Sequence, residues 1–148
     1  MPNTVSLHRV FKASPEKIFK AFADVRAYAS WIAPYGFICE VDLFDFQIGG
    51  KYHASFINFT TGNSHSFGGT FLDIIQNIRL QYDDVFDDPS MSGTMITTII
   101  LNPVVCGTEI HITQEGIPDM IPLAMCYLGW QESLEKLKAL VEPEIPNP

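Results

Sequence analysis

The feature that most constrains this chain is a run of β-like segments joined by short turns. Six stretches are rich in Val, Ile, Thr, Tyr and Phe, and turn-forming Gly, Asn, Asp and Pro separate them. They span residues 36–46, 51–59, 64–75, 78–86, 94–104 and 107–115. Parallel neighbours would need long crossover connections, so the short turns make consecutive strands antiparallel. The run therefore predicts an antiparallel meander of six strands.

Two short helices are predicted between a first strand, at residues 5–12, and this meander. Ser14 followed by Pro15 is typical of a helix N-terminus, because the serine caps free N–H groups and the proline lacks one. An apolar face continues this helix for about ten residues. Asp24 caps a second short helix, which ends before Pro34.

A long helix is predicted over residues 118–142, with Asp119 as its N-cap. Its apolar residues recur at alternating spacings of three and four, which is typical of a helix with one buried face. These residues are Met120, Leu123, Tyr127, Trp130, Leu134, Leu137 and Val141. Residues 143–148 cannot continue the helix, because they contain three prolines, and we expect a loose tail there.

The order of these elements predicts an α+β fold, with a curved sheet around a long helix, in a single domain over residues 1–148. One long helix cannot cover a seven-stranded antiparallel sheet unless the sheet curves around it. A curved sheet that grips a helix leaves space between the two. The two short helices after the first strand are then expected to close one end of that space.

Composition excludes several classes of partner. The net charge of −8 disfavours nucleic acid and anionic membrane surfaces, because both require clustered Lys and Arg. No apolar run approaches the ~20 residues of a membrane span, and the N-terminus does not resemble a signal peptide, so a cytoplasmic protein is expected. Cys39, Cys106 and Cys126 are expected to be free thiols. A small apolar ligand remains, with no cofactor, and a homodimer stays open.

Several motifs together resemble a known family. They are RVFKASPEKIF (9–19), WIAP (31–34), FQIGGKY (46–52), FGGTFLDII (67–75), GTEIHIT (107–113) and GWQESLEKL (129–137). In this order and spacing, over residues 5–142, they resemble the SRPBCC or START-like superfamily. The nearest branch is the homologues of the activator of the Hsp90 ATPase, with polyketide cyclase-like proteins among the relatives.

The resemblance implies a helix-grip fold with a deep apolar cavity between the sheet and the C-terminal helix. Family members bind lipids, sterols, polyketides or plant hormones, some are cyclases or dehydratases, and one branch stimulates a chaperone ATPase. The chain departs from the family pattern at Gln47, where an Arg is common, and at Ile32, where a second aromatic is common.

Aromatic side chains on faces that converge are the main candidates for a binding site, although core packing explains any single one better than ligand contact does. An apolar pocket with a few polar groups is typical of small-molecule sites. The candidate ligand-binding residues are Trp31, Phe37, Tyr52, Phe56, Asn58, Phe67, Phe71, Tyr82, Tyr127 and Trp130. Gly129 removes side-chain volume beside Trp130, which favours open space there.

Acidic residues offer weaker candidates for acid–base chemistry. Asp42 and Asp73 could face either a ligand or solvent, whereas Tyr82 shares the parity of Leu80 and is expected to face the cavity. The acidic run at 82–88 lacks the ligand alternation of a calcium loop, so a solvated hairpin loop is expected. No catalytic residue is assigned.

The four histidines show no metal-binding spacing, so no metal site is predicted. Strand alternation places His53 and His111 on the solvent side, whereas His65 could lie either at a cavity mouth or on the surface. Cys39 is expected to point inward, with no activating base near it in sequence.

These observations leave three hypotheses for function. The first is binding of a small hydrophobic or aromatic molecule in the cavity. The second is a cyclase or dehydratase, which requires an ionisable group inside the cavity with a shifted pKa. The third is a chaperone-associated interaction domain, which requires an exposed apolar patch instead of a pocket.

Overall fold

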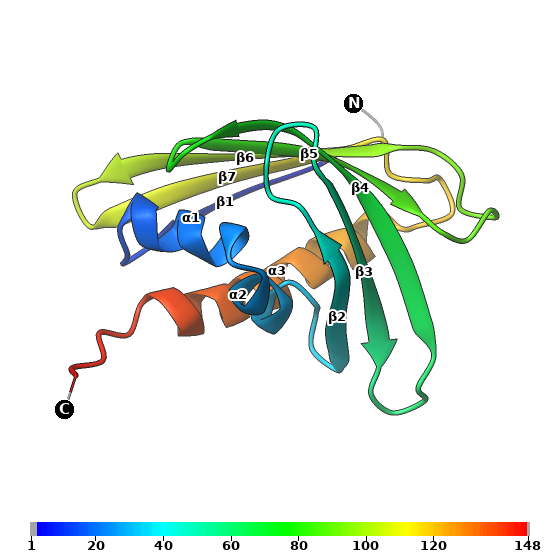
Figure 1. Ribbon diagram of the computed structural model, residues 1–148, viewed down its shortest axis with the longest axis horizontal. Helices are drawn as coiled ribbons and strands as arrows, with labels where there is room; N and C mark the ends of the chain where they lie inside the picture. Colours follow the sequence, from blue (N-terminus) through cyan, green and yellow to red (C-terminus); the bar gives the residue numbers. More distant parts are fainter. Residues whose placement is uncertain (1–2, 148) are drawn as a thin grey trace.

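The structure is a computed structural model that describes residues 3–147, and it consists of one curled antiparallel sheet with a long helix on its concave side (Figure 1). The strands are β1 Val5–Phe11, β2 Phe37–Phe44, β3 Lys51–Asn58, β4 Ser64–Ile75, β5 Arg79–Phe86, β6 Met95–Val104 and β7 Gly107–Glu115. The helices are α1 Pro15–Ala23, α2 Val25–Trp31 and α3 Leu123–Val141. This arrangement confirms the predicted helix-grip fold class.

The strand order is β1-β7-β6-β5-β4-β3-β2, so strands β2 to β7 form the predicted meander and β1 joins it beside β7. Two register irregularities, between Val41 and Leu43 and between Phe71 and Asp73, help the sheet to curl. Gly69 allows β4 and β5 to approach closely, because a Cβ atom there would lie 2.0 Å from the Asp83 carbonyl oxygen. The curl brings the inner faces of β2–β4 around to face α3 (Figure 1).

The two short helices begin at the predicted caps. The Ser14 hydroxyl accepts a hydrogen bond from the Lys17 amide (3.2 Å), and the Asp24 carboxylate accepts one from the Arg26 amide (2.9 Å). Side chains of α3 then satisfy carbonyls that follow α2. The Ser133 hydroxyl donates to the Ile32 carbonyl (2.7 Å), which holds α2 against the middle of α3.

The long helix begins at Leu123, later than predicted. Pro122 disfavours helical backbone at Ile121, so the segment before it cannot join the helix. Met120 is consequently outside the helix and 61% exposed. Asp119, the predicted cap, instead accepts a hydrogen bond from the Asn3 side chain (2.6 Å).

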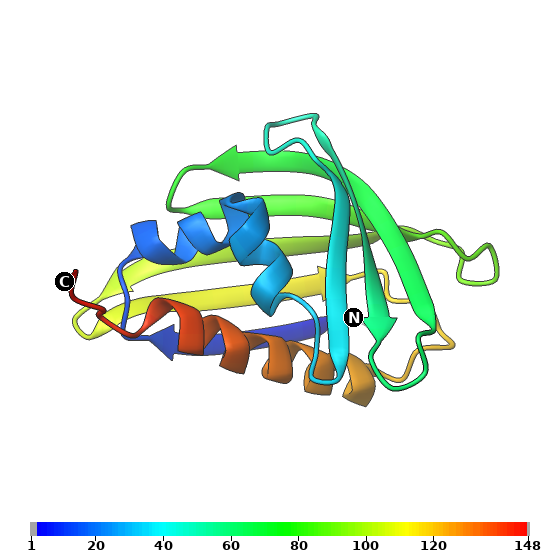
Figure 2. The same cartoon turned by 60° about the horizontal axis from the view of Figure 1, so that its bottom comes forward.

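The fully packed part of α3 is its C-terminal half. Its buried residues are Ser133, Leu134, Leu137 and Val141. The N-terminal half lies beside β2 and β3 (Figure 2) and carries no buried side chain. The space beneath this half is where a cavity forms.

Two further predictions concern the ends and the environment of the chain. Residues 1, 2 and 148, which belong to the predicted domain and tail, lie outside the described residues. Within residues 3–147, no helix combines the length and apolar character that crossing a membrane requires.

Candidate functional site: a cavity between the sheet and the C-terminal helix

A cavity of about 710 Å³ lies between the concave face of the sheet and the N-terminal half of α3. Its walls come from α2, from α3 and from strands β2 to β7, so residues distant in sequence meet there. Six of the ten candidate ligand-binding residues line it: Phe37, Tyr52, Phe56, Phe67, Tyr82 and Trp130. Gly129 also lines it, in keeping with the space expected beside Trp130.

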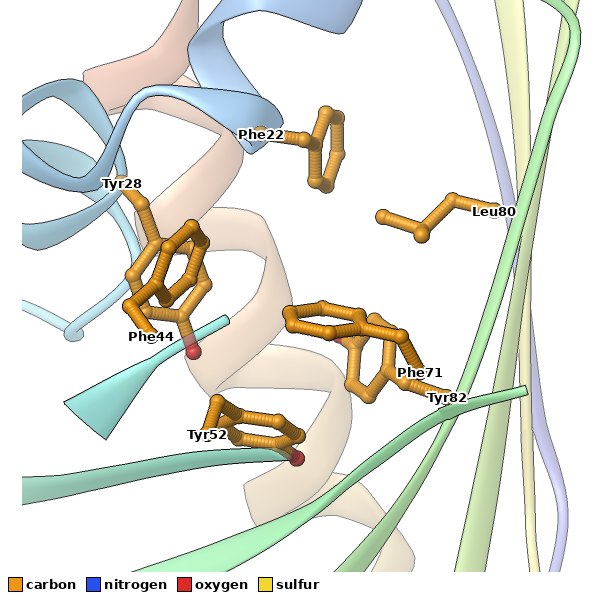
Figure 3. Close-up of a pocket in the computed structure, with 7 residues that line it drawn as sticks. All are labelled: Phe22, Tyr28, Phe44, Tyr52, Phe71, Leu80 and Tyr82. Carbon is orange, nitrogen blue, oxygen red and sulfur yellow. The ribbon is translucent and has the colours of Figure 1, made fainter. Parts of the chain in front are cut away.

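Trp31 and Phe71 lie in the packed end of the molecule instead. Trp31 is fully buried, and its indole N–H donates to the Ala21 carbonyl (2.8 Å). Phe71 lines a separate void of only about 10 Å³, around which seven side chains converge (Figure 3). Tyr28, Tyr52 and Tyr82 line both spaces and therefore form the floor that separates them.

Asn58 and Tyr127 have local roles outside the cavity lining. The Asn58 carboxamide accepts hydrogen bonds from the amides of Thr60 (2.9 Å) and Thr61 (3.2 Å), so it holds the turn between β3 and β4. The Tyr127 hydroxyl accepts a hydrogen bond from the Ser6 amide (3.2 Å), which joins α3 to β1.

The inner wall carries a chain of polar contacts across three elements. The Trp130 indole N–H donates to the Gln114 amide oxygen (3.2 Å), and the Gln114 amide nitrogen donates to the Thr97 hydroxyl (3.1 Å). The Tyr52 hydroxyl donates to the Asp83 carbonyl (2.9 Å). These bonds fix the side chains that border the cavity.

Asp84 is the main functional candidate that the sequence prediction missed. The acidic run was expected to be a solvated hairpin loop, although the strand predicted over residues 78–86 includes its first five residues. The structure confirms that strand as β5, which places Asp84 in the cavity wall. The loop prediction was wrong because the inward parity of Leu80 and Tyr82 continues to Asp84. That alternation was the available signal. The Asp84 Oδ1 atom is buried and makes no hydrogen bond.

Burial raises the pKa of Asp84 to about 7, although the nearby Tyr52 hydroxyl opposes that rise. The Asp84 carboxyl and the tyrosines of the floor influence one another. Burial raises the pKa of Tyr28, Tyr52 and Tyr82, and the negative charge of Asp84 raises each of them further. The site therefore holds a carboxyl group that changes charge near neutral pH, beside three phenols that stay protonated.

The mouth of the cavity is polar and acidic. His65 lines it, together with Asp87 and Asp88. Asp87 also bonds to His53, which lies outside the cavity between two carboxylates, 2.7 Å from Asp42 and 2.7 Å from Asp87. The hydrogen bond to Asp87, followed by that to Asp42, raises the pKa of His53.

The remaining acid and thiol candidates do not line the cavity. Asp42 is exposed and bonds to His53, and Asp73 pairs with Arg79 at the other end of the β4–β5 hairpin. Cys39 is partly buried, and desolvation raises its pKa to about 11, so its thiol is not activated.

Strand pairing brings together one group of metal-ligand types that sequence spacing did not indicate. His8 and His111 face each other across β1 and β7, and Glu109 lies beside them, with the donor atoms within 4.8 Å of one another. His8 lies 3.0 Å from the Glu109 carboxylate, and His111 lies 3.6 Å from it. These residues could hold a metal ion, but they are half exposed and already satisfy one another.

Comparison with known proteins places this architecture in a family. Residues 12–142 match the family described as activator of Hsp90 ATPase homolog 1-like protein. A protein from Chromobacterium violaceum has a solved structure with a TM-score of 0.96 and 51% identity, over 97% of this chain and 100% of that chain. No curated protein matches the sequence.

More distant structures share the fold alone. A protein from Rhodobacter sphaeroides has a TM-score of 0.82 at 19% identity, over 93% of this chain and 90% of that chain. The AHSA1 protein from Silicibacter pomeroyi has a TM-score of 0.80 at 20% identity, over 92% of this chain and 95% of that chain. With the family match over most of its length, the chain belongs to the activator of Hsp90 ATPase homolog 1-like family of the SRPBCC superfamily.

Proposed function

We propose that this protein binds a small, largely apolar or aromatic molecule in the cavity between the sheet and α3. The observation that carries the proposal is a cavity of about 710 Å³ with aromatic walls. Small-molecule sites commonly span about 300–1,000 Å³ and combine apolar walls with a few polar groups. Each 100 Å² of apolar ligand surface removed from water contributes about 2.5 kcal/mol to binding.

The arrangement of the walls supports binding in place of simple packing. Hydrogen bonds join Trp130 to Gln114 and Gln114 to Thr97, and they orient these side chains in the wall. Gly129 contributes no side chain at the point where α3 borders the cavity. Rigid walls reduce the entropy that binding costs.

The test uses N-phenyl-1-naphthylamine, a neutral probe whose fluorescence increases in apolar surroundings. The protein is expected to bind it saturably. The variant Gly129→Phe is expected to weaken binding at least about tenfold, because the ring occupies the cavity.

Gly129→Ala is the matched control. A Cβ atom at this position meets only the Pro34 side chain, at an ordinary contact distance of 3.6 Å. Alanine is therefore expected to preserve binding. Equal affinity in the wild type and Gly129→Phe, or the lack of saturable binding in the wild type, would contradict the proposal.

A second candidate function is acid–base catalysis, of the cyclase or dehydratase kind, and Asp84 is the observation that favours it. A buried carboxyl with a pKa of about 7 is suited to accept or donate a proton at neutral pH. The Kemp elimination of 5-nitrobenzisoxazole tests this capacity, because a carboxylate removes the C3 proton while the N–O bond breaks. A rate that is unchanged in Asp84→Asn would rule out Asp84 as the base.

A further inference from the structure

The polar groups on the inner wall differ in whether they already have hydrogen-bond partners within the protein. Gln114 uses both ends of its amide, with Trp130 and Thr97. The Tyr52 hydroxyl donates to a backbone carbonyl. Among the side chains of residues 3–147, Asp84 Oδ1 is the buried nitrogen or oxygen atom without a partner.

An unpartnered buried acceptor costs stability, and a bound donor removes that cost. Asp84 belongs to the cavity wall and its side chain is only partly buried, so a molecule in the cavity can approach the carboxyl group. Oδ1 itself is shielded, and a rotation about the Cβ–Cγ bond is needed to turn it toward a donor. Its neighbour Asp83 shows the contrasting case, since the Asp83 carboxylate accepts a hydrogen bond from the Thr70 amide (2.8 Å). The two adjacent carboxylates therefore differ, and in the one that lines the cavity the Oδ1 atom lacks a donor.

The charges that border the cavity have one sign. Three carboxylates line it, from Asp84, Asp87 and Asp88, and His65 is the basic side chain among the described lining residues. Neither Lys nor Arg contributes to the described wall. With a net charge of −8 for the chain, this field favours cations and opposes anions.

Three aromatic rings lie near the same carboxyl group, since burial raises the pKa of Tyr28, Tyr52 and Tyr82 and the negative charge of that carboxyl raises each of them further. Tyr28, Tyr52 and Tyr82 form the floor of the cavity, and Trp130 lies in its wall. The faces of such rings attract cations, most strongly where water is displaced. The floor thus combines a negative charge with rings that accommodate an ammonium group.

We propose that the cavity selects cationic amphiphiles, meaning molecules with an apolar or aromatic body and one protonated amine that donates to Asp84. This inference deepens the proposed function and rests on it. The aromatic body fills the apolar part of the cavity, and the ammonium group reaches the carboxylate near the tyrosine floor. Fatty acids and other anionic amphiphiles are excluded by repulsion from the same carboxylates.

Affinity for an amine is expected to depend on pH. Burial, with a smaller contribution from Asp83, raises the pKa of Asp84 to about 7. The other titratable groups around the cavity are the three tyrosines of the floor and His65, Asp87, Asp88 and Cys126. The ionised carboxylate binds the amine, so affinity is expected to fall at least about tenfold from pH 8 to pH 5.5.

The experiment compares three probes with the same two-ring body by isothermal titration calorimetry at pH 8. They are 1-naphthylmethylamine, which is a cation, 1-naphthalenemethanol, which is neutral, and 1-naphthoate, which is an anion. The wild type is expected to bind the amine about 10–100-fold more tightly than the anion, as a hydrogen-bonded charge pair implies. Asp84→Asn is expected to lose this preference for the amine but to bind the alcohol with unchanged affinity.

Glu40→Gln is the matched control, because Glu40 is an exposed carboxylate outside the cavity wall. It removes the same charge and is expected to leave all three affinities unchanged. If the affinity of Asp84→Asn for the amine still depends on pH, that remaining dependence is assigned to His65, Asp87 and Asp88 at the mouth.

The probes separate this inference from the proposed function. If the alcohol binds but the amine has no advantage over the anion, cation selection is wrong and the proposed function stands. If Glu40→Gln weakens amine binding as much as Asp84→Asn does, the effect is one of net charge and the role of Asp84 is wrong. If none of the three probes binds, both proposals fail.

Discussion

The two ends of the space beneath the sheet contain the same kinds of residue, yet one end is packed and the other is open. At the packed end, Trp31 is fully buried and the remaining void measures about 10 Å³. At the open end, Trp130 borders a cavity of about 710 Å³. Both tryptophans donate their indole N–H to a partner, so hydrogen bonding does not distinguish the two ends.

The helices account for the difference. Helices α1 and α2 direct Phe22 and Tyr28 into the packed end, where they meet side chains of the sheet (Figure 3). The N-terminal half of α3 presents the small Cys126 and Gly129 beside Met125 and Trp130, and together they leave the space opposite β3 to β7 unfilled. The proposed ligand binding depends on this contrast, since larger residues on α3 would fill the open end.

The largest effect is expected from truncating the tryptophan of each end. Trp31→Ala creates a new cavity in a packed core and removes the donor to Ala21, so a loss of about 3–5 kcal/mol is expected. Trp130→Ala enlarges an existing cavity and is expected to cost about 1 kcal/mol, mainly through the bond to Gln114. Urea denaturation of both variants measures the difference. Equal losses would mean that both ends are packed alike.

A second prediction concerns the charge of the Asp84 carboxylate at the open end. Asp84→Asn is expected to stabilise the protein at pH 8, by up to about 4 kcal/mol, since a pKa of about 7 lies roughly three units above the ordinary value. Because the pKa of Asp84 is higher in the folded state than in the unfolded chain, Asp84 does not reduce the free energy of unfolding below about pH 4, where it is protonated in both states. The free energy of unfolding then falls as the pH rises to about 7, because over this range the Asp84 carboxyl is ionised in the unfolded chain but still protonated in the folded protein.

The measurement is the free energy of unfolding at pH 4 and pH 8. Asn and the protonated Asp are nearly isosteric, so wild type and variant are expected to agree at pH 4 and diverge at pH 8. Glu40→Gln is the control and is expected to show no such divergence. A destabilised Asp84→Asn at pH 8 would mean that the carboxylate has a structural partner.

Most of the fold could be predicted from local patterns. The turns between β2 and β7 determine the antiparallel order, and the caps at Ser14 and Asp24 set the starts of α1 and α2. The start of α3 was missed because the apolar spacing continues through Met120, whereas Pro122 acts on the backbone. Periodicity does not record that restriction.

The site was predictable only in part. Strand parity correctly places Tyr52 and Tyr82 inside, but it cannot separate the packed end from the open end. Because parity cannot make that distinction, Trp31 and Phe71 were predicted beside the residues that line the larger cavity, whereas neither of them lines it. Asp84 was missed because composition outweighed parity in an acidic segment, although its neighbours in the strand point inward.

A smaller change in stability is expected for a substitution at Gly129, where α3 borders the open end. Gly129→Ala is expected to stabilise the protein by about 0.5–1 kcal/mol, because alanine favours the helix and restricts the unfolded chain. The new methyl group meets only Pro34, at 3.6 Å. The measurement is the urea midpoint with an unchanged m-value. A loss of stability would indicate that the open end tolerates no added volume.

The smallest effect is expected on the outside of the sheet, where carboxylates are paired, in contrast to Asp84 inside. His53 lies between Asp87 and Asp42, and these bonds raise its pKa above 6.5. Its stabilisation is therefore complete below pH 6.5 and is lost as the pH rises through the folded-state pKa.

Since the three side chains are partly exposed, the contribution of the His53–Asp42 and His53–Asp87 pairs is expected to be only about 0.2–0.5 kcal/mol. His53→Gln in an Asp84→Asn background isolates it, because Asp84 no longer titrates there. The difference in unfolding free energy between the two proteins is expected to be larger at pH 6 than at pH 9. If it grows toward pH 9 instead, the neutral imidazole holds the carboxylates, and the outer pairing does not depend on charge.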